Sequence, residues 1–214
     1  MNPLHPIAIF GAGGQGREVL QLIHQINQSR EQQWQCIGWF DDGIEKGSII
    51  EGLPVLGGMK ELNNWPEELA VAMAVAWPAT KRKICHLFAN NKLSFPTLIH
   101  PEVRFDKNEV NIGQGTIITQ GCRFTVNITI GQFVLLNLSC IVTHDVVIED
   151  YCSIMPSVNL SGAVVLEEAV YVGTGSQIIQ LLTIGKNSII GAGSVVVRDI
   201  PANCTAFGVP AKVK

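Results

Sequence analysis

An apolar residue recurs at every sixth position from Ile112 to Val196, and no polar residue interrupts the series. The residue after each apolar anchor is often Gly or acidic, and the residue four positions after it is often small or β-branched. A six-residue period matches neither the α-helical period nor the simple alternation of a strand. It matches a short flat strand followed by a tight turn, with three such units closing a triangular coil. The pattern therefore predicts a parallel β-helix of about five coils, with two inward positions in each repeat.

The first hundred residues follow a different pattern, in which short apolar runs alternate with segments of helical periodicity. Strands are expected over residues 6–10, 36–40, 69–76 and 95–99, helices over residues 17–28 and 79–90, and loops or turns over residues 43–60 and 63–68. This alternation predicts a small parallel sheet, half of a Rossmann-type fold. We therefore expect an α/β domain over residues 1–100 and a β-helix domain over residues 101–214.

A glycine loop follows the first predicted strand. Gly11, Gly13 and Gly16 satisfy the G-x-G-x-x-G pattern, and acidic residues end the next predicted strand. Glycines let the backbone approach a ligand closely, and the N-terminus of the following helix offers free N–H groups to a phosphate. The segment is too short for a complete dinucleotide-binding domain. We therefore expect it to bind the nucleotide portion of a ligand, and the alternative is a tight turn that only joins the strand to the helix.

Composition narrows the possible partners. The chain has 15 Lys+Arg and 18 Asp+Glu, for a formal net charge of -3, and no basic stripe that could follow a phosphate backbone. No apolar run approaches the roughly 18 to 20 residues that span a bilayer. The six cysteines form no C-x-x-C pair, which favours small buried hydrophobes over metal ligands or disulfides. We expect a cytoplasmic protein with no nucleic acid partner, no membrane insertion and no bound metal.

Several motifs, taken together, resemble those of a known family. They are Ile9–Gly16, Gly38–Asp42, Pro54–Gly57, Leu98–Pro101, Thr143–Asp145, Ser161–Gly162 and Phe207–Lys212. The chain resembles the sugar O/N-acetyltransferases of the sialic acid O-acetyltransferase type, which are hexapeptide-repeat transferases. The resemblance implies a left-handed β-helix, a homotrimer, acetyl-CoA in the groove between adjacent β-helices, and a sugar nucleotide bound by the N-terminal domain. Without such motifs, the repeat alone would also fit a stiff rod or a trimerisation device.

The expected reaction needs one positioned base, because an amine that attacks a thioester must lose a proton. An imidazole that titrates near neutrality suits this role. His144 is the candidate: it stands two residues after the anchor Val142, off the inward positions, and should point outward. The adjacent Asp145 could orient the ring and raise its basicity.

The resemblance also implies binding roles. Asn137 matches a residue near the acceptor sugar or the acetyl group, and we expect it to stack near His144. The sugar nucleotide is expected to contact Gly13, Gly14, Gln15, Gly16, Asp41 and Asp42. Acetyl-CoA is expected to contact Ser153, Gly162, Gly173, Thr174, Gly191, Ala192 and Lys212, the last within a C-terminal segment that closes over the cofactor.

The sequence departs from the family pattern at three places. Ser153 stands where members often have a second histidine that binds the acetyl carbonyl, Gln15 replaces a common histidine, and Ala76 replaces a glycine that commonly ends the third strand. The expected function is acetyl-CoA-dependent N-acetylation of the 4-amino group of a nucleotide-linked deoxy-sugar for bacterial surface glycans. The alternatives are O-acetylation of sialic acid or another sugar hydroxyl, and a sugar-nucleotide-binding or scaffold protein without turnover. The sequence does not fix the sugar, the nucleotide (UDP, dTDP or GDP) or the acyl chain length.

Overall fold

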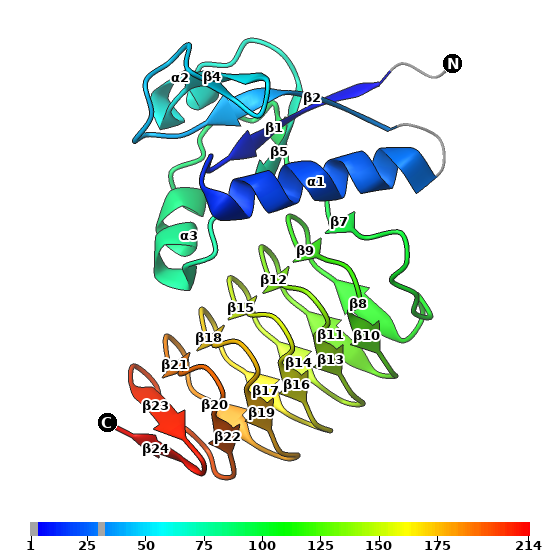
Figure 1. The fold of residues 1–214 in the computed structure, drawn as a ribbon, viewed down its shortest axis with the longest axis vertical. Helices are drawn as coiled ribbons and strands as arrows, with labels where there is room; N and C mark the ends of the chain where they lie inside the picture. The colour runs from blue at the N-terminus through cyan, green and yellow to red at the C-terminus, as the bar shows by residue number, and fades with distance from the viewer. Residues whose placement is uncertain (1–3, 30–32) are drawn as a thin grey trace.

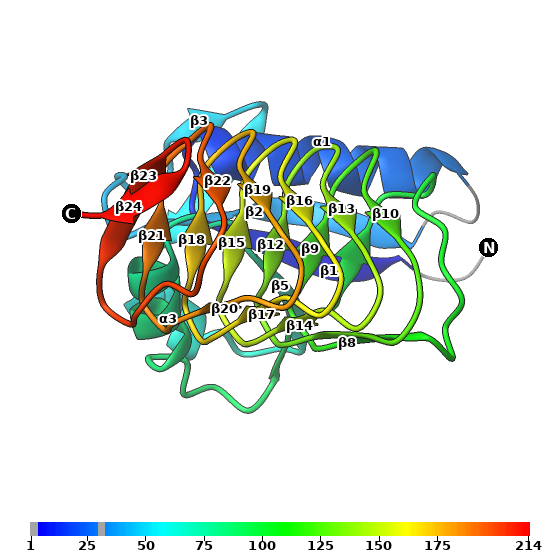
Figure 2. The same cartoon turned by 90° about the horizontal axis from the view of Figure 1, so that it is seen from below.

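The computed structural model of the protein describes residues 4–29 and 33–214. A small α/β domain sits on one side of a long triangular coil, with the C-terminus at the far end of that coil (Figure 1). Viewed from below, the short strands of successive coils lie in parallel rows (Figure 2). These two parts agree with the predicted fold, a small parallel-sheet domain followed by a parallel β-helix, and the arrangement is consistent with a left-handed coil.

The N-terminal sheet is built around β1 (His5–Phe10), which pairs in parallel with β2 (Trp34–Phe40) and β5 (Leu69–Met73). Side chains of β1 alternate between its two faces, so Ile7 and Ile9 pack with α1 (Gly14–Ser29). Ala8 and Phe10 pack on the opposite side. The α1 side of the sheet shares its core with β-helix residues Leu135 and Met155. Helix α1 therefore lies between the sheet and the β-helix (Figure 1).

Several predicted boundaries in this domain were wrong. Residues 43–60 were predicted as a loop but contain β3 (Ile49–Ile50), β4 (Leu53–Gly57) and the start of α2 (Met59–Asn63), which continues to the edge of the next predicted loop. Strand β5 ends at Met73, and α3 (Pro78–Cys85) is shorter than the predicted helix. These elements are short and lie at the sheet edge or in the connections, where local sequence periodicity is too brief to identify them.

The strand predicted over residues 95–99 was also wrong in its assignment. The N-terminal sheet ends at β6 (Leu93–Ser94), which pairs with β5. The apolar pair after it, β7 (Leu98–Ile99), pairs with β9 (Ile117–Ile118) of the β-helix instead. The predicted division into residues 1–100 and 101–214 stays a prediction.

The β-helix has three faces, each formed by one parallel sheet. Face 1 lies under the N-terminal domain and contains β7, β9, β12 (Leu135–Leu136), β15 (Ser153–Ile154), β18 (Tyr171–Val172), β21 (Ile189–Ile190), β23 (Thr205–Gly208) and the antiparallel β24 (Ala211–Val213). Face 2 contains β10 (Arg123–Phe124), β13 (Ile141–Val142), β16 (Asn159–Leu160), β19 (Gln177–Ile178) and β22 (Val195–Val196). Face 3 contains β8 (Val110–Ile112), β11 (Ile128–Ile130), β14 (Val147–Ile148), β17 (Val165–Leu166) and β20 (Thr183–Ile184).

The inward positions are the ones that the repeat predicted. The anchors Leu136, Val142, Ile148 and Ile154 have no exposed surface, and the other anchors are buried or pack against this core. The second inward position is also buried, for example at Cys140. Strand partners are 18 residues apart, as in the pair of Ile141 with Asn159, so one coil consists of three hexapeptides.

The corners explain how six residues suffice for a strand and a turn. The third residue after most anchors has a positive φ: at the corner after β13 this is Asp145, with a φ of 62°, and one coil later it is Ala163, with a φ of 56°. A residue in the left-handed region turns the chain from one face to the next within very few residues. These corners form straight columns along the coil, and the candidate functional residues lie in two of them.

Candidate active site

His144 lies on the corner between face 2 and face 3, directly after β13, with 61% of its side chain exposed. Its Nδ1 lies 2.8 Å from Oδ2 of Asp145. The other carboxylate oxygen, Oδ1, accepts a hydrogen bond of 2.6 Å from Nδ2 of Asn127, on the same corner one coil earlier. His144 therefore points outward, as predicted, and Asp145 is fixed from both sides.

The contact with Asp145 determines which ring nitrogen of His144 is free. An ionised carboxylate can only accept a hydrogen bond, so Nδ1 carries the proton and Nε2 keeps its lone pair. The pKa of Asp145 is held below its ordinary value, first by the hydrogen bond from Asn127 and then by the one from His144. Asp145 thus remains a carboxylate at neutral pH, and the neutral form of His144 is an acceptor at Nε2.

Gly162 makes room for the ring of His144. It occupies the equivalent corner position one coil later, and a Cβ added to it would overlap Cε1 and Nε2 of His144. A residue with a side chain at 162 would therefore force the imidazole away from this position. The contact of Gly162 in the structure is with the histidine, and its predicted contact with acetyl-CoA stays a prediction.

The glycine loop joins β1 to α1 as predicted. Gly16 must lack a side chain because a Cβ there would overlap the carbonyl oxygen of Gly11, whose own φ is +102°. By contrast, a Cβ added to Gly13 or Gly14 meets nothing within 4 Å. Packing within the chain therefore explains Gly11 and Gly16, whereas Gly13 and Gly14 border open space at the N-terminus of α1.

Gln15 of this loop meets the β-helix at Asn137. The Nδ2 atom of Asn137 lies 3.5 Å from Oε1 of Gln15, and Asn137 is only 5% exposed. The buried Nε2 of Gln15 has no hydrogen-bond partner among the described residues. A cavity of about 170 Å³ adjoins Asn137 and is lined also by Glu18 and Gln21 of α1. Helix α1 and the β-helix thus form a recess beside the contact between Gln15 and Asn137.

The two predicted acidic ligands at the end of β2 already bind backbone groups. Asp41 accepts hydrogen bonds from the N–H of Ala12 and the N–H of Gly43, at 2.9 and 2.8 Å. Asp42 accepts one of 2.7 Å from the N–H of Met59, at the start of α2. Asp41 therefore braces the glycine loop, and its predicted contact with a nucleotide stays a prediction.

Asn137 and His144 lie on different corners of the triangle. Asn137 follows β12 on the corner between faces 1 and 2, and His144 follows β13 on the next corner. The N-terminal domain covers face 1, so the corner of His144 is the one opposite that domain. Within one chain, the structure does not bring the candidate base to the glycine loop or to Asn137, so the stacking of Asn137 near His144 was wrong.

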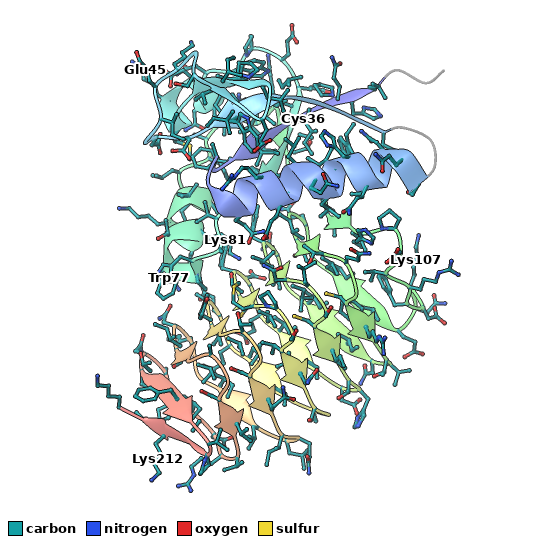
Figure 3. All side chains as sticks on the ribbon, in the orientation of Figure 1. Cys36, Glu45, Trp77, Lys81, Lys107 and Lys212 are labelled. Carbon is teal, nitrogen blue, oxygen red and sulfur yellow. The ribbon has the colours of Figure 1, made fainter. Side chains whose placement is uncertain are left out.

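The small residues predicted for the cofactor continue the column of Asn137. Backbone hydrogen bonds link Asn137 to Ile154, Met155 to Val172, Gly173 to Ile190 and Gly191 to Ala206 in successive coils. Thr174 and Ala192 follow the two glycines and are exposed. Lys212 is exposed on β24 at the C-terminal end of the coil (Figure 3). This column runs from Asn137 past the buried Met155 to Gly173 and Gly191, so its two glycines lie on the side of the C-terminal end of the coil.

Ser153 differs most from its predicted surroundings. It has no exposed surface, and its Oγ accepts a hydrogen bond of 2.9 Å from Nζ of Lys81, which reaches down from α3 (Figure 3). The same amine donates to the carbonyl of Cys152 at 3.1 Å. Burial lowers the pKa of Lys81 to about 7. In this conformation Ser153 is covered by the N-terminal domain, and its predicted contact with acetyl-CoA stays a prediction.

Sequence reasoning missed Asn127 and Lys81. Asn127 stands 18 residues before Asp145, so the length of one coil could have identified it as a neighbour. Lys81 lies in the basic run Lys81–Lys83, which gave no sign that one of the three would be buried. Among residues 4–29 and 33–214, no group of His, Cys, Asp or Glu could hold a metal ion, and no helix is long and apolar enough to cross a bilayer.

Comparison with known proteins agrees with this fold. Residues 6–88 match the family model of the PglD N-terminal domain. A variant of the perosamine N-acetyltransferase from Caulobacter crescentus, solved with CoA and GDP-perosamine, superposes with a TM-score of 0.88 at 26% identity, covering 99% of this chain and 98% of that one. The acetyltransferase domain of PglB from Neisseria gonorrhoeae, solved with acetyl coenzyme A, gives 0.88 at 30% identity, covering 99% and 100%.

A third solved structure, WeeI from Acinetobacter baumannii AYE, has a TM-score of 0.87 at 32% identity over 98% of this chain and 100% of that one. The curated relatives match only a short stretch: the chain spans about a fifth of the length of the first of them. The β-helix, with three hexapeptides in each coil, and these similarities place the chain in the hexapeptide-repeat class. Within that class, the chain belongs to the family of nucleotide-sugar amino acetyltransferases.

Proposed function

We propose that the protein transfers an acetyl group from acetyl-CoA to the amino group of a nucleotide-linked amino-sugar, in the synthesis of a bacterial surface glycan. The observation that carries this proposal is the arrangement of His144, whose outward ring is oriented by Asp145 and accommodated by Gly162. The likeness over the whole chain to a structure that contains CoA and GDP-perosamine supports this substrate class.

In the proposed reaction, the nitrogen of the sugar amine bonds to the thioester carbonyl carbon, and the bond from that carbon to sulfur breaks. Nε2 of His144 takes the proton that the amine loses and returns it to the departing sulfur, so CoA leaves as the thiol and His144 is again neutral. Asp145 stabilises the imidazolium that forms, because its carboxylate accepts the hydrogen bond from Nδ1. General-base assistance of this kind typically contributes about 10² to 10⁴ in rate.

We further propose that each active site is formed by two copies of the chain in a homotrimer. The glycine loop, Gln15 and Asn137 meet at one edge of the β-helix, and His144 lies on another corner. A neighbouring copy that packs its His144 corner against the first copy's Asn137 column would bring these groups together. The column from Asn137 to Gly191 would then line the groove between the copies, and Gly173 and Gly191 would accommodate the pantetheine arm.

The proposal is tested by following thiol release from acetyl-CoA with UDP-, dTDP- and GDP-linked 4-amino-sugars, and by mass spectrometry of the product to locate the new acetyl group. Release that depends on an amino-sugar, with an amide in the product, supports N-acetylation. Acetylation of a hydroxyl on the same sugar, or on sialic acid, would instead identify the activity as O-acetylation. A protein that binds a sugar nucleotide but releases no thiol with any acceptor would be a binding or scaffold protein.

A further inference from the structure

Lys81 is a buried lysine without an acidic partner. It lies on the first turn of α3 with 1% of its surface exposed, although lysine is almost never fully buried unless it is paired. None of the ion pairs in residues 4–29 and 33–214 includes it. The neighbouring residue Arg82, by contrast, pairs with Glu168 of the β-helix at 3.1 Å.

The partners of Lys81 are neutral and few. Nζ donates to the carbonyl of Cys152 and to Oγ of Ser153, both on the β-helix. The other titratable groups that face it are the thiols of Cys85 on α3 and of Cys152, and burial raises the pKa of each to about 12. Both thiols are therefore uncharged at neutral pH and do not neutralise an ammonium.

The number of acceptors matches the uncharged amine. A neutral lysine has two N–H bonds, and each of them has an acceptor here. An ammonium has three N–H bonds, and the third would be buried without a partner, which is costly. The lowered pKa of Lys81, about 7, has the same cause, because burial penalises the charged form of the amine.

Lys81 is also close to the edge between the glycine loop and α3, where we place nucleotide binding; this is called the nucleotide-binding edge below. Its backbone N–H bonds to the carbonyl of Trp77, at the N-terminus of α3, and the ring of Trp77 lies 5.1 Å from that of Tyr171 on β18. The segment before Trp77 abuts the glycine loop, since the N–H of Ala74 bonds to the carbonyl of Phe10. A shift of α3 on the β-helix would therefore move one wall of this edge.

We propose that Lys81 is a positioning residue that attaches the nucleotide-binding edge to the β-helix through an uncharged amine. This inference rests on the proposed function, because it assigns the acceptor side of that reaction to the edge between the glycine loop and α3. Lys81 itself does not contact the substrate. Protonation of Lys81 loosens the packing of α3 on β15, so nucleotide binding weakens as the pH falls through about 7. CoA binding along the column of Asn137, Gly173 and Gly191 does not change.

The test is to measure, by calorimetry, the dissociation constants of UDP, dTDP, GDP and CoA for the wild type, Lys81→Met and Lys81→Arg at pH 6 and pH 8, on either side of the pKa of about 7. Lys83→Met, an exposed position on the same helix, is the matched control. Lys81→Met keeps the aliphatic stem but cannot donate, and Lys81→Arg is always charged. At pH 8 both should weaken nucleotide binding by about tenfold and leave CoA binding within about twofold, with Lys83→Met like the wild type.

The pH dependence separates positioning from a general loss of structure. Nucleotide phosphates also titrate near this range. The pH dependence of nucleotide binding to Lys81→Met measures the contribution of the phosphates without that of Lys81. The wild type should therefore weaken between pH 8 and pH 6 by at least about threefold more than Lys81→Met does. The proposal is overturned if Lys81→Met binds nucleotide as the wild type does at both pH values, or if it weakens nucleotide and CoA equally.

A readout without ligand keeps this inference separate from the proposed function. Hydrogen exchange of the α3 amides, normalised to those of α1, should increase in the wild type and in Lys83→Met from pH 8 to pH 6. If Lys81→Met does not fold, the pH dependence of α3 hydrogen exchange in the wild type still tests the inference about Lys81. Failure of UDP, dTDP and GDP alike to bind the wild type would contradict the proposed function, whereas α3 protection that does not depend on pH would contradict the inference about Lys81.

Discussion

The imidazole of His144 lies over Gly162 of the next coil, in space that any side chain at residue 162 would fill. Because one coil is 18 residues long, the corner residue that follows His144 in its column is always residue 162. The β-helix thereby makes the orientation of the candidate base depend on a residue that has no chemistry of its own.

Gly162→Ala should therefore lower kcat by about 10-fold or more without unfolding the protein, because the new methyl group displaces the imidazole from Asp145. Thiol release and thermal unfolding would be measured together. Ser161→Ala, at the neighbouring position of the same corner, is the matched control and should retain activity. Full activity in Gly162→Ala would show that the observed ring position is not required.

Asn127→Gly should raise the pKa of Asp145, because the hydrogen bond from Asn127 is the first cause of its lowered value. Glycine is chosen because residue 127 has a φ of 54°, which alanine would adopt only with strain. A lowered carboxyl pKa means that the interaction is present above the ordinary pKa and is lost as the pH falls through the lowered one. The interaction of the Asp145 carboxylate with His144 should therefore be lost at higher pH in the variant.

The carboxyl pKa can be followed directly by carbon NMR titration of labelled aspartate. Asn187→Gly is the matched control, because Asn187 also has a positive φ and bonds to another corner asparagine, Asn203. An unchanged Asp145 titration in Asn127→Gly would contradict the role given to that hydrogen bond.

Stability should depend on pH through Lys81. Its folded pKa is lowered to about 7, so the unfolded chain binds the proton more tightly than the native one between about pH 7 and the ordinary value of 10.5. The contribution of Lys81 to the free energy of unfolding therefore increases with pH across that window, by a few kcal/mol at most. Chemical denaturation of the wild type and Lys81→Met at several pH values should show a difference that grows with pH. A difference that is constant with pH would contradict the lowered pKa.

The six-residue column makes a prediction about the core. Ile148 is fully buried, so Ile148→Ala should lower the free energy of unfolding by about 2 to 5 kcal/mol. The adjacent Val147 points outward and is 36% exposed, so Val147→Ala should cost much less. Equal losses measured by denaturant titration would mean that the inward and outward assignments are wrong.

The sequence was most informative where a period repeats many times. The inward positions, the outward orientation of His144 and the glycine loop could all be predicted, because each depends on local spacing. The hairpin of β3 and β4 and the helix α2 could not, since each is too short to show a period.

Contacts between segments far apart in the chain could not be predicted from the sequence either. The burial of Lys81 depends on how α3 packs against β15, which lies 72 residues away along the chain. Likewise, the separation of Asn137 from His144 depends on the three-sided cross-section, because residues seven apart fall on neighbouring corners rather than in one column.

The shared active site can be tested by mixing inactive chains. His144→Ala and Asn137→Ala should each be inactive alone, because each removes one contributor from every site. Dissociating and reassembling them in equal amounts should restore about a quarter of wild-type activity if His144 and Asn137 of one site come from different copies. No recovery would indicate that both residues act within one chain.

The central claim is that His144 is the general base of acetyl transfer, and its most direct test is the rate of thiol release from acetyl-CoA by His144→Ala. With the best sugar-nucleotide acceptor, we expect a loss of at least about 100-fold in kcat. His24→Gln, an exposed histidine on α1, should leave the rate unchanged. A His144→Ala enzyme that releases thiol at the wild-type rate would contradict the account.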